Sequence, residues 1–263
     1  MQQKLAVVIP VYNHVILTSQ TIDSLVACTK SDLTVIIVDD CSSDDTHLYC
    51  TEVLQEMFAP GKFLYHRHEV NKGVNAAWNS GLRIAMSSEI PYICIANNDL
   101  IFTDGWDIPL VDALKNDGYA LVSPYSTEQK KPDDFPLGST RHPNPMGLAI
   151  LGACFMFKRE LIHRIGCFPE DMVHYYGDNW ILKMCDARGL PAGHIQASYI
   201  HHKFCMTSSE LDNAKWFNED REAYNKYLST FDLDIEDAYQ FAVSHEGSKE
   251  ERSAFYANRM INK

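Results

Sequence analysis

The sequence of 263 residues contains no apolar run long enough to cross a membrane. A spanning helix needs about 20 predominantly apolar residues, whereas the apolar run 5–9 is closed by Pro10 after five residues. That run is also too short for the apolar region of a secretory signal peptide. The sequence therefore predicts a chain with no transmembrane segment and no secretory leader.

Positive charge is scarce. The chain has 23 Lys and Arg against 35 Asp and Glu, which gives a formal net charge of -12. Nucleic acids and anionic lipid surfaces are bound by clustered Lys and Arg, so this balance argues against both as partners. An anionic substrate would need a local positive element, such as a metal ion or a helix N-terminus.

The chain has eight cysteines but no C-x-x-C pair. The cysteines are scattered, and some, such as Cys94 and Cys154, lie among apolar residues. This pattern favours buried or free thiols in a reducing compartment over disulfides or a zinc site. Together with the missing leader, it predicts a cytoplasmic location.

Short apolar runs rich in β-branched residues alternate with helix-like segments along the chain. We expect strands at 5–9, 33–38, 63–65, 92–96, 148–157 and 195–200. We expect helices at 14–28, 43–58, 74–85, 158–165 and 177–187. The alternation predicts an α/β fold, with a mostly parallel sheet flanked by helices on both faces. Gly152, inside an expected strand, predicts that another group approaches the backbone closely there.

The length suits one α/β domain with a small appendage. We assign residues 1–210 to the α/β domain and 211–263 to a helical C-terminal appendage. The appendage either packs on the domain or mediates association, so a homo-oligomer is possible. The proline-rich segment 123–147 is expected to be a long loop, either disordered or a functional lid.

Polar clusters follow directly after three of the expected strands. They are Tyr12-Asn13, Asp39-Asp40 and Asn97-Asn98-Asp99. Ligands of open α/β sheets bind at the carboxyl ends of the strands, so we expect the site there. The G-x-G-x-x-G fingerprint of dinucleotide-binding dehydrogenases is absent after the first strand, and so is the glycine-rich basic loop typical of nucleotidyltransferases.

Six motifs in order resemble the GT-A-fold glycosyltransferases of family 2, across roughly residues 4–208. The motifs are Val8–Asn13, Val38–Asp44, Asn71–Gly81, Asn97–Asp99, Tyr176–Trp180 and His201-His202. The resemblance implies a GT-A (Rossmann-like) fold and sugar transfer from a nucleotide-diphosphate sugar. It also implies a divalent metal ion, Mn²⁺ or Mg²⁺.

The resemblance places the nucleotide at the first three motifs. It implies donor contacts from Pro10, Val11, Tyr12, Asn13, Asp40, Asn71, Gly73 and Asn98. A carboxylate such as Asp40 can accept the imide N–H of uracil, which makes UDP the favoured nucleotide, although thymine and guanine offer comparable donors. The alternatives are local: Asp39 and Asp40 would cap the following helix, and Asn13 would be an N-cap. For Asn75 and Asn79, we favour tethering of a loop over contact with the donor.

The resemblance assigns the metal to Asp99 and to a histidine of the pair His201-His202, with His201 preferred. A carboxylate with an imidazole suits Mn²⁺ at least as well as Mg²⁺. Asn97 and Asn98 replace acidic residues that relatives carry, which makes the ligand set less charged. As an alternative, Asp99 caps the following turn.

Asp178 matches the family's catalytic base, which deprotonates the acceptor hydroxyl in an inverting transfer. The sequence departs from the family here, because Gly177 and Trp180 stand where acidic residues are usual. Asp178 could instead be the N-cap of the next helix, and Trp180 is either a platform for a sugar ring or part of the core.

The sequence thus predicts an inverting, metal-dependent glycosyltransferase. The alternative is a catalytically silent nucleotide- or sugar-binding protein on the same scaffold. The sugar, the linkage and the acceptor, whether glycan, lipid-linked or protein, are not readable from these residues.

Overall fold

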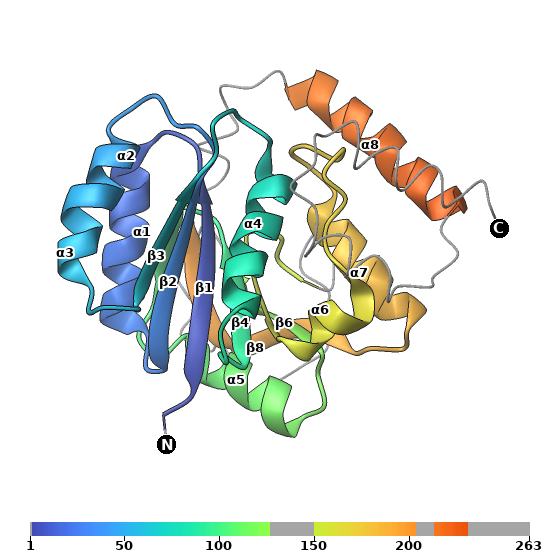
Figure 1. Ribbon diagram of the computed structural model, residues 1–263. Helices are drawn as coiled ribbons and strands as arrows, with labels where there is room; N and C mark the ends of the chain where they lie inside the picture. Colours follow the sequence, from blue (N-terminus) through green and yellow to red (C-terminus); the bar gives the residue numbers. More distant parts are fainter. Residues whose placement is uncertain (1, 127–149, 204–212, 231–263) are drawn as a thin grey trace.

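The computed structural model describes residues 2–126, 150–203 and 213–230. An eight-stranded sheet runs through the molecule in the order β3-β2-β1-β4-β7-β6-β8-β5, with helices on both of its faces (Figure 1). The strands are β1 (Lys4–Val11), β2 (Asp32–Asp39), β3 (Phe63–Arg67), β4 (Tyr92–Ala96), β5 (Leu100–Phe102), β6 (Leu121–Ser126), β7 (Cys154–Lys158) and β8 (Ala192–His202). The predicted α/β class is confirmed.

The first half of the sheet is parallel and the second half is mixed. β3, β2, β1 and β4 are parallel neighbours. β7 is antiparallel to both β4 and β6, and β5 is antiparallel to β8, whereas β6 and β8 are parallel. The chain moves outward from β1 to β3 and then returns to β4 on the other side of β1. The carboxyl ends of β1 and β4 therefore lie side by side, which is where such sheets bind ligands.

The helices divide between the two faces. They are α1 (Val15–Cys28), α2 (Thr46–Leu48), the π-helical turn η1 (Tyr49–Leu54), α3 (Gln55–Met57), α4 (Val74–Met86), α5 (Asp107–Asn116), α6 (Glu160–Ile165), α7 (Gly177–Ala187) and α8 (Asn213–Thr230). None of the helices in the described ranges is both long enough and apolar enough to cross a membrane.

Strand alternation builds two cores. Val7 and Ile9 of β1 share a core with α1, η1 and α5, whereas Ala6 and Val8 share the opposite core with α4, α6 and α7. Successive side chains of a strand point to opposite faces, so a fully apolar strand serves both cores. The apolar run 5–9 is buried along its whole length for this reason, and so are residues 34–38 of the run 33–38.

Four elements differ from the expectation. β5 and α5 were not expected, and β6 occupies residues that we had assigned to the start of the loop 123–147. Pro124 in β6 made this segment look irregular, and the β6–β8 pairing does shift register between Pro124 and Tyr125. β7 begins only at Cys154, later than the expected start at 148. The rest of the proposed loop lies outside the described residues.

The helix of the C-terminal segment is present as α8, which lies across the loop before α7 (Figure 1). Its Tyr227 is buried in the same core as α6 and α7. Residues 213–230 thus form a helix that packs on the domain. Residues 231–263 lie outside the described ranges, so the proposed extent of the appendage stays a prediction.

Helix α4 lies unusually close to β1 at Gly81. A Cβ atom at this glycine would lie 2.2 Å from Val8 Cγ1. We expect Gly81→Ala to lower the free energy of unfolding by about 1–3 kcal/mol through overpacking, although alanine is the better helix former. Urea unfolding measures the change.

Val8→Ala removes the obstructing atom and provides the matched control. In V8A/G81A the cost should be smaller than the sum of the two single costs by more than about 0.5 kcal/mol. If the losses in the free energy of unfolding were strictly additive, the close approach of Val8 would not be the reason for a glycine at position 81.

Candidate functional site

A cavity of about 250 Å³ opens at the carboxyl ends of β1, β2 and β4. Its lining comes from six separated stretches of chain: Pro10, Val11, Tyr12, Asp40, Asn71, Gly73, Val74, Ala77, Asn97, Asn98, Asp99, His174, Tyr175 and His202. Most of the sequence-predicted donor residues are therefore brought together. Asn13, His201 and Asp178 are not among the lining residues.

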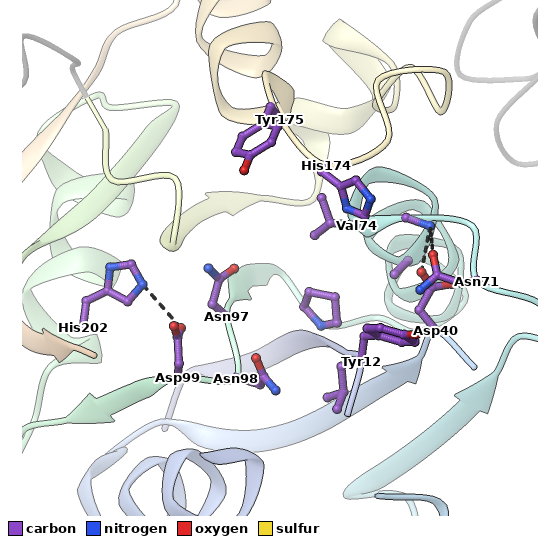
Figure 2. Close-up of a pocket in the computed structure, with 14 residues that line it drawn as sticks. Tyr12, Asp40, Asn71, Val74, Asn97, Asn98, Asp99, His174, Tyr175 and His202 are labelled. Carbon is purple, nitrogen blue, oxygen red and sulfur yellow. Dashed lines mark hydrogen bonds and ion pairs between the residues drawn. The ribbon is translucent and has the colours of Figure 1, made fainter. Parts of the chain in front are cut away.

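Figure 2 shows that the pocket has two ends and a second wall. Asp40, Tyr12 and Asn71 lie at one end, and Asp99 with His202 at the other. Asn97 and Asn98 lie between them, while His174 and Tyr175 face them from the opposite side. An elongated ligand could therefore touch both ends at once.

Asp40 organises the loop that carries Asn71. The residue is 4% exposed. Oδ1 lies 2.7 Å from His68 Nδ1 and accepts the backbone N–H of Lys72 at 2.8 Å, and Oδ2 accepts the N–H of Gly73 at 2.7 Å. A carboxylate has about four acceptor sites. Three are used, so one remains on Oδ2 for a ligand.

Gly73 is required where the loop meets the second wall. Its φ is 87°, a left-handed conformation that favours glycine. A Cβ here would lie 2.4 Å from the carbonyl oxygen of Val173. Asn71 Oδ1 accepts the same Gly73 N–H at 3.2 Å. Asn71 thus shapes the loop as well as lining the pocket.

Asn13 has a different place from the two that we expected. It does not line the pocket, and the N-cap of α1 is His14. Asn13 has a φ of 57°, and its Oδ1 accepts the backbone N–H of Ser43 at 2.7 Å. Its role in the structure is to tie the turn after β1 to the turn after β2.

The pairing of β5 with β8 builds the Asp99 end. Leu100 lies opposite His202 in this ladder, so His202 comes next to Asp99. Asp99 is 3% exposed, and its Oδ1 lies 3.4 Å from His202 Nε2. This Oδ1 is buried and makes no hydrogen bond within the described part of the chain. Such an atom fits a cation.

His201 points to the other face of β8. Its ring packs edge-on against Tyr199, with ring centroids 4.9 Å apart. The preference for His201 as the metal-binding histidine therefore disagrees with the geometry, because His202 is the one beside Asp99. Two neighbouring residues of a strand face opposite sides. Asp99 and His202 are therefore a pair of candidate ligands, and no group of three His, Cys, Asp or Glu that could hold a metal is found among the described residues.

Asn98 lies between the two ends and is nearly buried. Its Nδ2 donates to Thr18 Oγ1 of α1 at 3.0 Å. The amide therefore anchors the turn after β4 to α1. The neighbouring Asn97 donates its backbone N–H to the carbonyl oxygen of Ala153 at 2.8 Å, which fixes this turn to the segment before β7.

Side chains of α4 hold the irregular segment 166–176. Asn75 Nδ2 donates to the carbonyl oxygen of Met172 at 2.6 Å, and Asn79 Nδ2 donates to that of Phe168 at 2.8 Å. Asn79 Oδ1 accepts the Phe168 N–H in return at 3.0 Å. The tethering role favoured for both asparagines is the one that the structure shows.

The same segment contributes His174 and Tyr175 to the pocket. Neither residue is predicted from the sequence to belong to the site. Neither belongs to a motif, and the segment has no apolar periodicity. The two residues that follow them, Tyr176 and Gly177, belong to the motif Tyr176–Trp180. This neighbourhood was the one signal in the sequence that His174 and Tyr175 lie near the site.

Asp178 lies in the first turn of α7, three residues after the lining residue Tyr175, and is not itself among the lining residues. The close approach expected at Gly152 is the approach of this carboxylate, because a Cβ there would lie 2.3 Å from Asp178 Oδ2. Asp178 Oδ1 accepts the Asn179 N–H at 2.9 Å. Burial raises the pKa of Asp178 above the usual range of an aspartate, opposed by hydrogen bonds from backbone N–H groups.

The departures from the family around Asp178 have a packing cause. A Cβ at Gly177 would lie 2.2 Å from Asn75 Oδ1 and 2.4 Å from the Trp78 ring. No acidic side chain fits there while Asn75 holds the loop. Trp180 belongs to the core, with its Nε1 donating to the Cys167 carbonyl at 3.3 Å. It is not a platform for a sugar.

The charges of the pocket are those of carboxylates. Asp40 and Asp99 are present, and the described lining includes no Lys or Arg. The described cysteines are free thiols. Burial raises the pKa of Cys50, Cys167 and Cys185 to about 12, so these thiols are neutral and unreactive near pH 7.

Known proteins identify the family. The model of Glycosyl transferase family 2 matches residues 6–166, more than half of the chain, so the chain belongs to this family. A protein named "Uncharacterized glycosyltransferase" from Rickettsia felis is 30% identical over 107 residues, which are 41% of this chain and 17% of that protein. One from Nostoc sp. is 34% identical over 90 residues, 34% of this chain and 27% of that protein. These matches span less than a third of each relative.

Solved structures confirm the GT-A fold. GalNAc-T7, solved with UDP, GalNAc and Mn²⁺, has a TM-score of 0.65 at 15% identity, covering 98% of this chain and 54% of that one. The mannosyltransferase PcManGT from Pyrobaculum calidifontis, solved with GDP-Man and Mn²⁺, has a TM-score of 0.64 at 18% identity, covering 100% and 82%.

The contacts of Asp40 predict a cost when one acceptor is lost. In Asp40→Asn, an amide NH₂ replaces one oxygen and faces N–H donors. We expect the free energy of unfolding to fall by about 1–3 kcal/mol, measured by urea unfolding. Asp45→Asn removes the same charge from an exposed side chain without a cap hydrogen bond and should cost less than about 0.5 kcal/mol. Equal costs for both would contradict the role given to Asp40.

Proposed function

We propose that the protein is an inverting glycosyltransferase that uses a UDP-sugar and a divalent metal ion, Mn²⁺ or Mg²⁺. One observation carries the proposal: a single pocket joins the acceptor site on Asp40 to the Asp99–His202 pair, with no Lys or Arg in its described lining. A nucleotide diphosphate spanning these ends would place two phosphates against carboxylates. A cation offsets that repulsion.

The end of the pocket at Asp40 supports a nucleotide with a uracil-type base. Asp40 has one acceptor site left after its three intramolecular hydrogen bonds. The imide N–H of uracil or thymine needs one acceptor, whereas guanine presents a ring N–H beside its exocyclic amine. Tyr12 lies at the same end of the pocket and offers a flat apolar face to a base (Figure 2).

The end of the pocket at Asp99 and His202 supports a bound metal ion. The orphaned Oδ1 of Asp99 and the imidazole of His202 are one oxygen and one nitrogen ligand, a set that Mn²⁺ accepts. Phosphate oxygens and water would complete the shell. When bound, the ion neutralises the charge that develops on the leaving diphosphate. Both neighbouring folds were solved with Mn²⁺.

Asp178 is proposed as the base. An acceptor hydroxyl would give its proton to the Asp178 carboxylate while its oxygen bonds to the anomeric carbon of the sugar. The bond from that carbon to the diphosphate oxygen breaks on the opposite face, which inverts the configuration. The Asn179 N–H and the space at Gly152 hold the carboxylate in place, three residues after Tyr175 of the pocket lining. A glycan, a lipid-linked sugar or a protein can each supply the hydroxyl.

The two adjacent histidines allow a matched test of the metal end. We expect His202→Ala to weaken UDP binding in the presence of Mn²⁺ by at least about tenfold. His201→Ala should leave the dissociation constant within about twofold, because its ring packs on Tyr199. Isothermal calorimetry with Mn²⁺ and with EDTA measures both variants. The metal assignment would be contradicted if both variants bound UDP with equal affinity, or if EDTA did not change the affinity of the wild type for UDP.

Asp178→Asn tests the base. Turnover should fall by about 10²- to 10⁴-fold, with UDP affinity unchanged. The raised pKa of Asp178 means that wild-type activity is present above this pKa and is lost as the pH falls through it. For an aspartate, a pKa raised by burial also means that ionisation costs stability, so the variant should unfold at the same or a higher temperature at pH 7.

A comparison of melting temperatures at low pH provides the control. At a pH below both the folded and the unfolded pKa, the wild type and D178N should show similar melting temperatures. A wild type that binds UDP with Mn²⁺ but shows no transfer or donor hydrolysis would favour the catalytically silent binding protein instead.

A further inference from the structure

Helix α8 contacts the pocket wall through one buried carboxylate. Asp220 is 1% exposed. Its Oδ1 accepts the backbone N–H of Val173 at 2.8 Å, and its Oδ2 accepts those of His174 and Tyr175, both at 2.8 Å. Three consecutive N–H groups that converge on one carboxylate fix the backbone of this turn. Two of these three residues line the pocket.

The turn is held from the other side by α4. The N–H of Val74 donates to the Val173 carbonyl at 2.8 Å, and Gly73 leaves the space for this contact. The turn 173–175 is thus clamped between the start of α4 and the middle of α8. Both clamps end on residues next to the pocket, so the position of the second wall depends on both.

Aromatic side chains add to the contact between α8 and this turn. Trp216 packs edge-on against His174, with ring centroids 4.9 Å apart. Phe217 packs against Tyr175, with centroids 5.5 Å apart. Tyr227 donates its hydroxyl proton to Asp171 at 2.6 Å. These contacts attach the helix, whereas Asp220 sets the path of the backbone.

The side chains of His174 and Tyr175 point toward the pocket, so the path of their backbone affects the shape of the site. In Figure 2 the Tyr175 hydroxyl points toward Asn97, and His174 lies above the side of the pocket where Asn71 and Asp40 lie. The space between the two ends is the place for the diphosphate and the sugar in the proposed function. A turn that shifted by a fraction of an ångström would move both side chains relative to that space.

We propose that Asp220 is a positioning residue: it places His174 and Tyr175 against the nucleotide-diphosphate donor, which makes α8 part of the donor site. The inference rests on the proposed function for the identity of the ligand. Asp220 touches no ligand itself and acts through the turn that it holds.

The test uses Asp220→Asn in the full chain. Its amide NH₂ would face backbone N–H groups that now meet an oxygen, so the turn should lose its fixed position. We expect UDP with Mn²⁺ to bind about 5- to 50-fold more weakly by calorimetry. Glu219→Gln removes the same charge from the exposed neighbouring residue and should leave the affinity unchanged.

A double-mutant cycle separates positioning from general stability. In the H174A/Y175F background, the wall side chains that Asp220 positions are already truncated, so adding D220N should weaken UDP binding by less than about twofold. A purely structural role predicts the same fold-loss in both backgrounds. Tyr227→Phe loosens the attachment of α8 away from the wall and should lower the melting temperature without changing UDP affinity.

The outcomes distinguish this inference from the function on which it rests. A wild type that binds no UDP with Mn²⁺ would refute the proposed function. If the wild type binds UDP and D220N binds it equally well, the role of Asp220 is refuted and the proposed function stands. The same holds if the losses of affinity in the double-mutant cycle are additive. If D220N is too unstable to purify, Asp220→Glu keeps the charge but displaces the carboxylate, and it should show the same loss of affinity.

Discussion

One wall of the pocket is a stretch of backbone that cannot satisfy its own hydrogen bonds. Residues 166–176 lie between α6 and α7 and form neither helix nor strand, yet much of the segment is buried, so its N–H and C=O groups need partners from elsewhere. Asn75 and Asn79 of α4 supply them on one side, and Asp220 of α8 supplies them on the other. The rest of the site follows from where this segment is held.

Holding the segment there has consequences for the acidic residues. Because Asn75 fills the space beside Gly177, the motif at the start of α7 keeps Asp178 as its one carboxylate, and Gly152 leaves room for it. The pocket itself contains Asp40 and Asp99, and its described lining lacks Lys and Arg. A chain with a net charge of -12 thus offers a phosphate ligand little positive charge of its own, which is why a cation is central to the proposed chemistry.

The sequence predicted what depends on apolar pattern. The run 5–9 and residues 34–38 are buried, and the runs 5–9 and 33–38 formed the expected parallel strands, with polar clusters at their carboxyl ends. It could not predict β5, which has three residues, or β6, which contains Pro124. For that reason the choice between His201 and His202 was open: the ladder of β5 with β8 decides which histidine faces Asp99. His174 and Tyr175 were missed because their place depends on distant side chains such as Asp220.

The central claim is that one nucleotide diphosphate spans the pocket from Asp40 to a metal ion at Asp99 and His202. A crystal grown with UDP and Mn²⁺, with diffraction data recorded at the manganese absorption edge, tests it most directly. We expect an anomalous peak beside Asp99 Oδ1 and His202 Nε2, next to the diphosphate, with the uracil ring hydrogen-bonded to Asp40. Manganese bound elsewhere, or UDP bound with its base remote from Asp40, would contradict it.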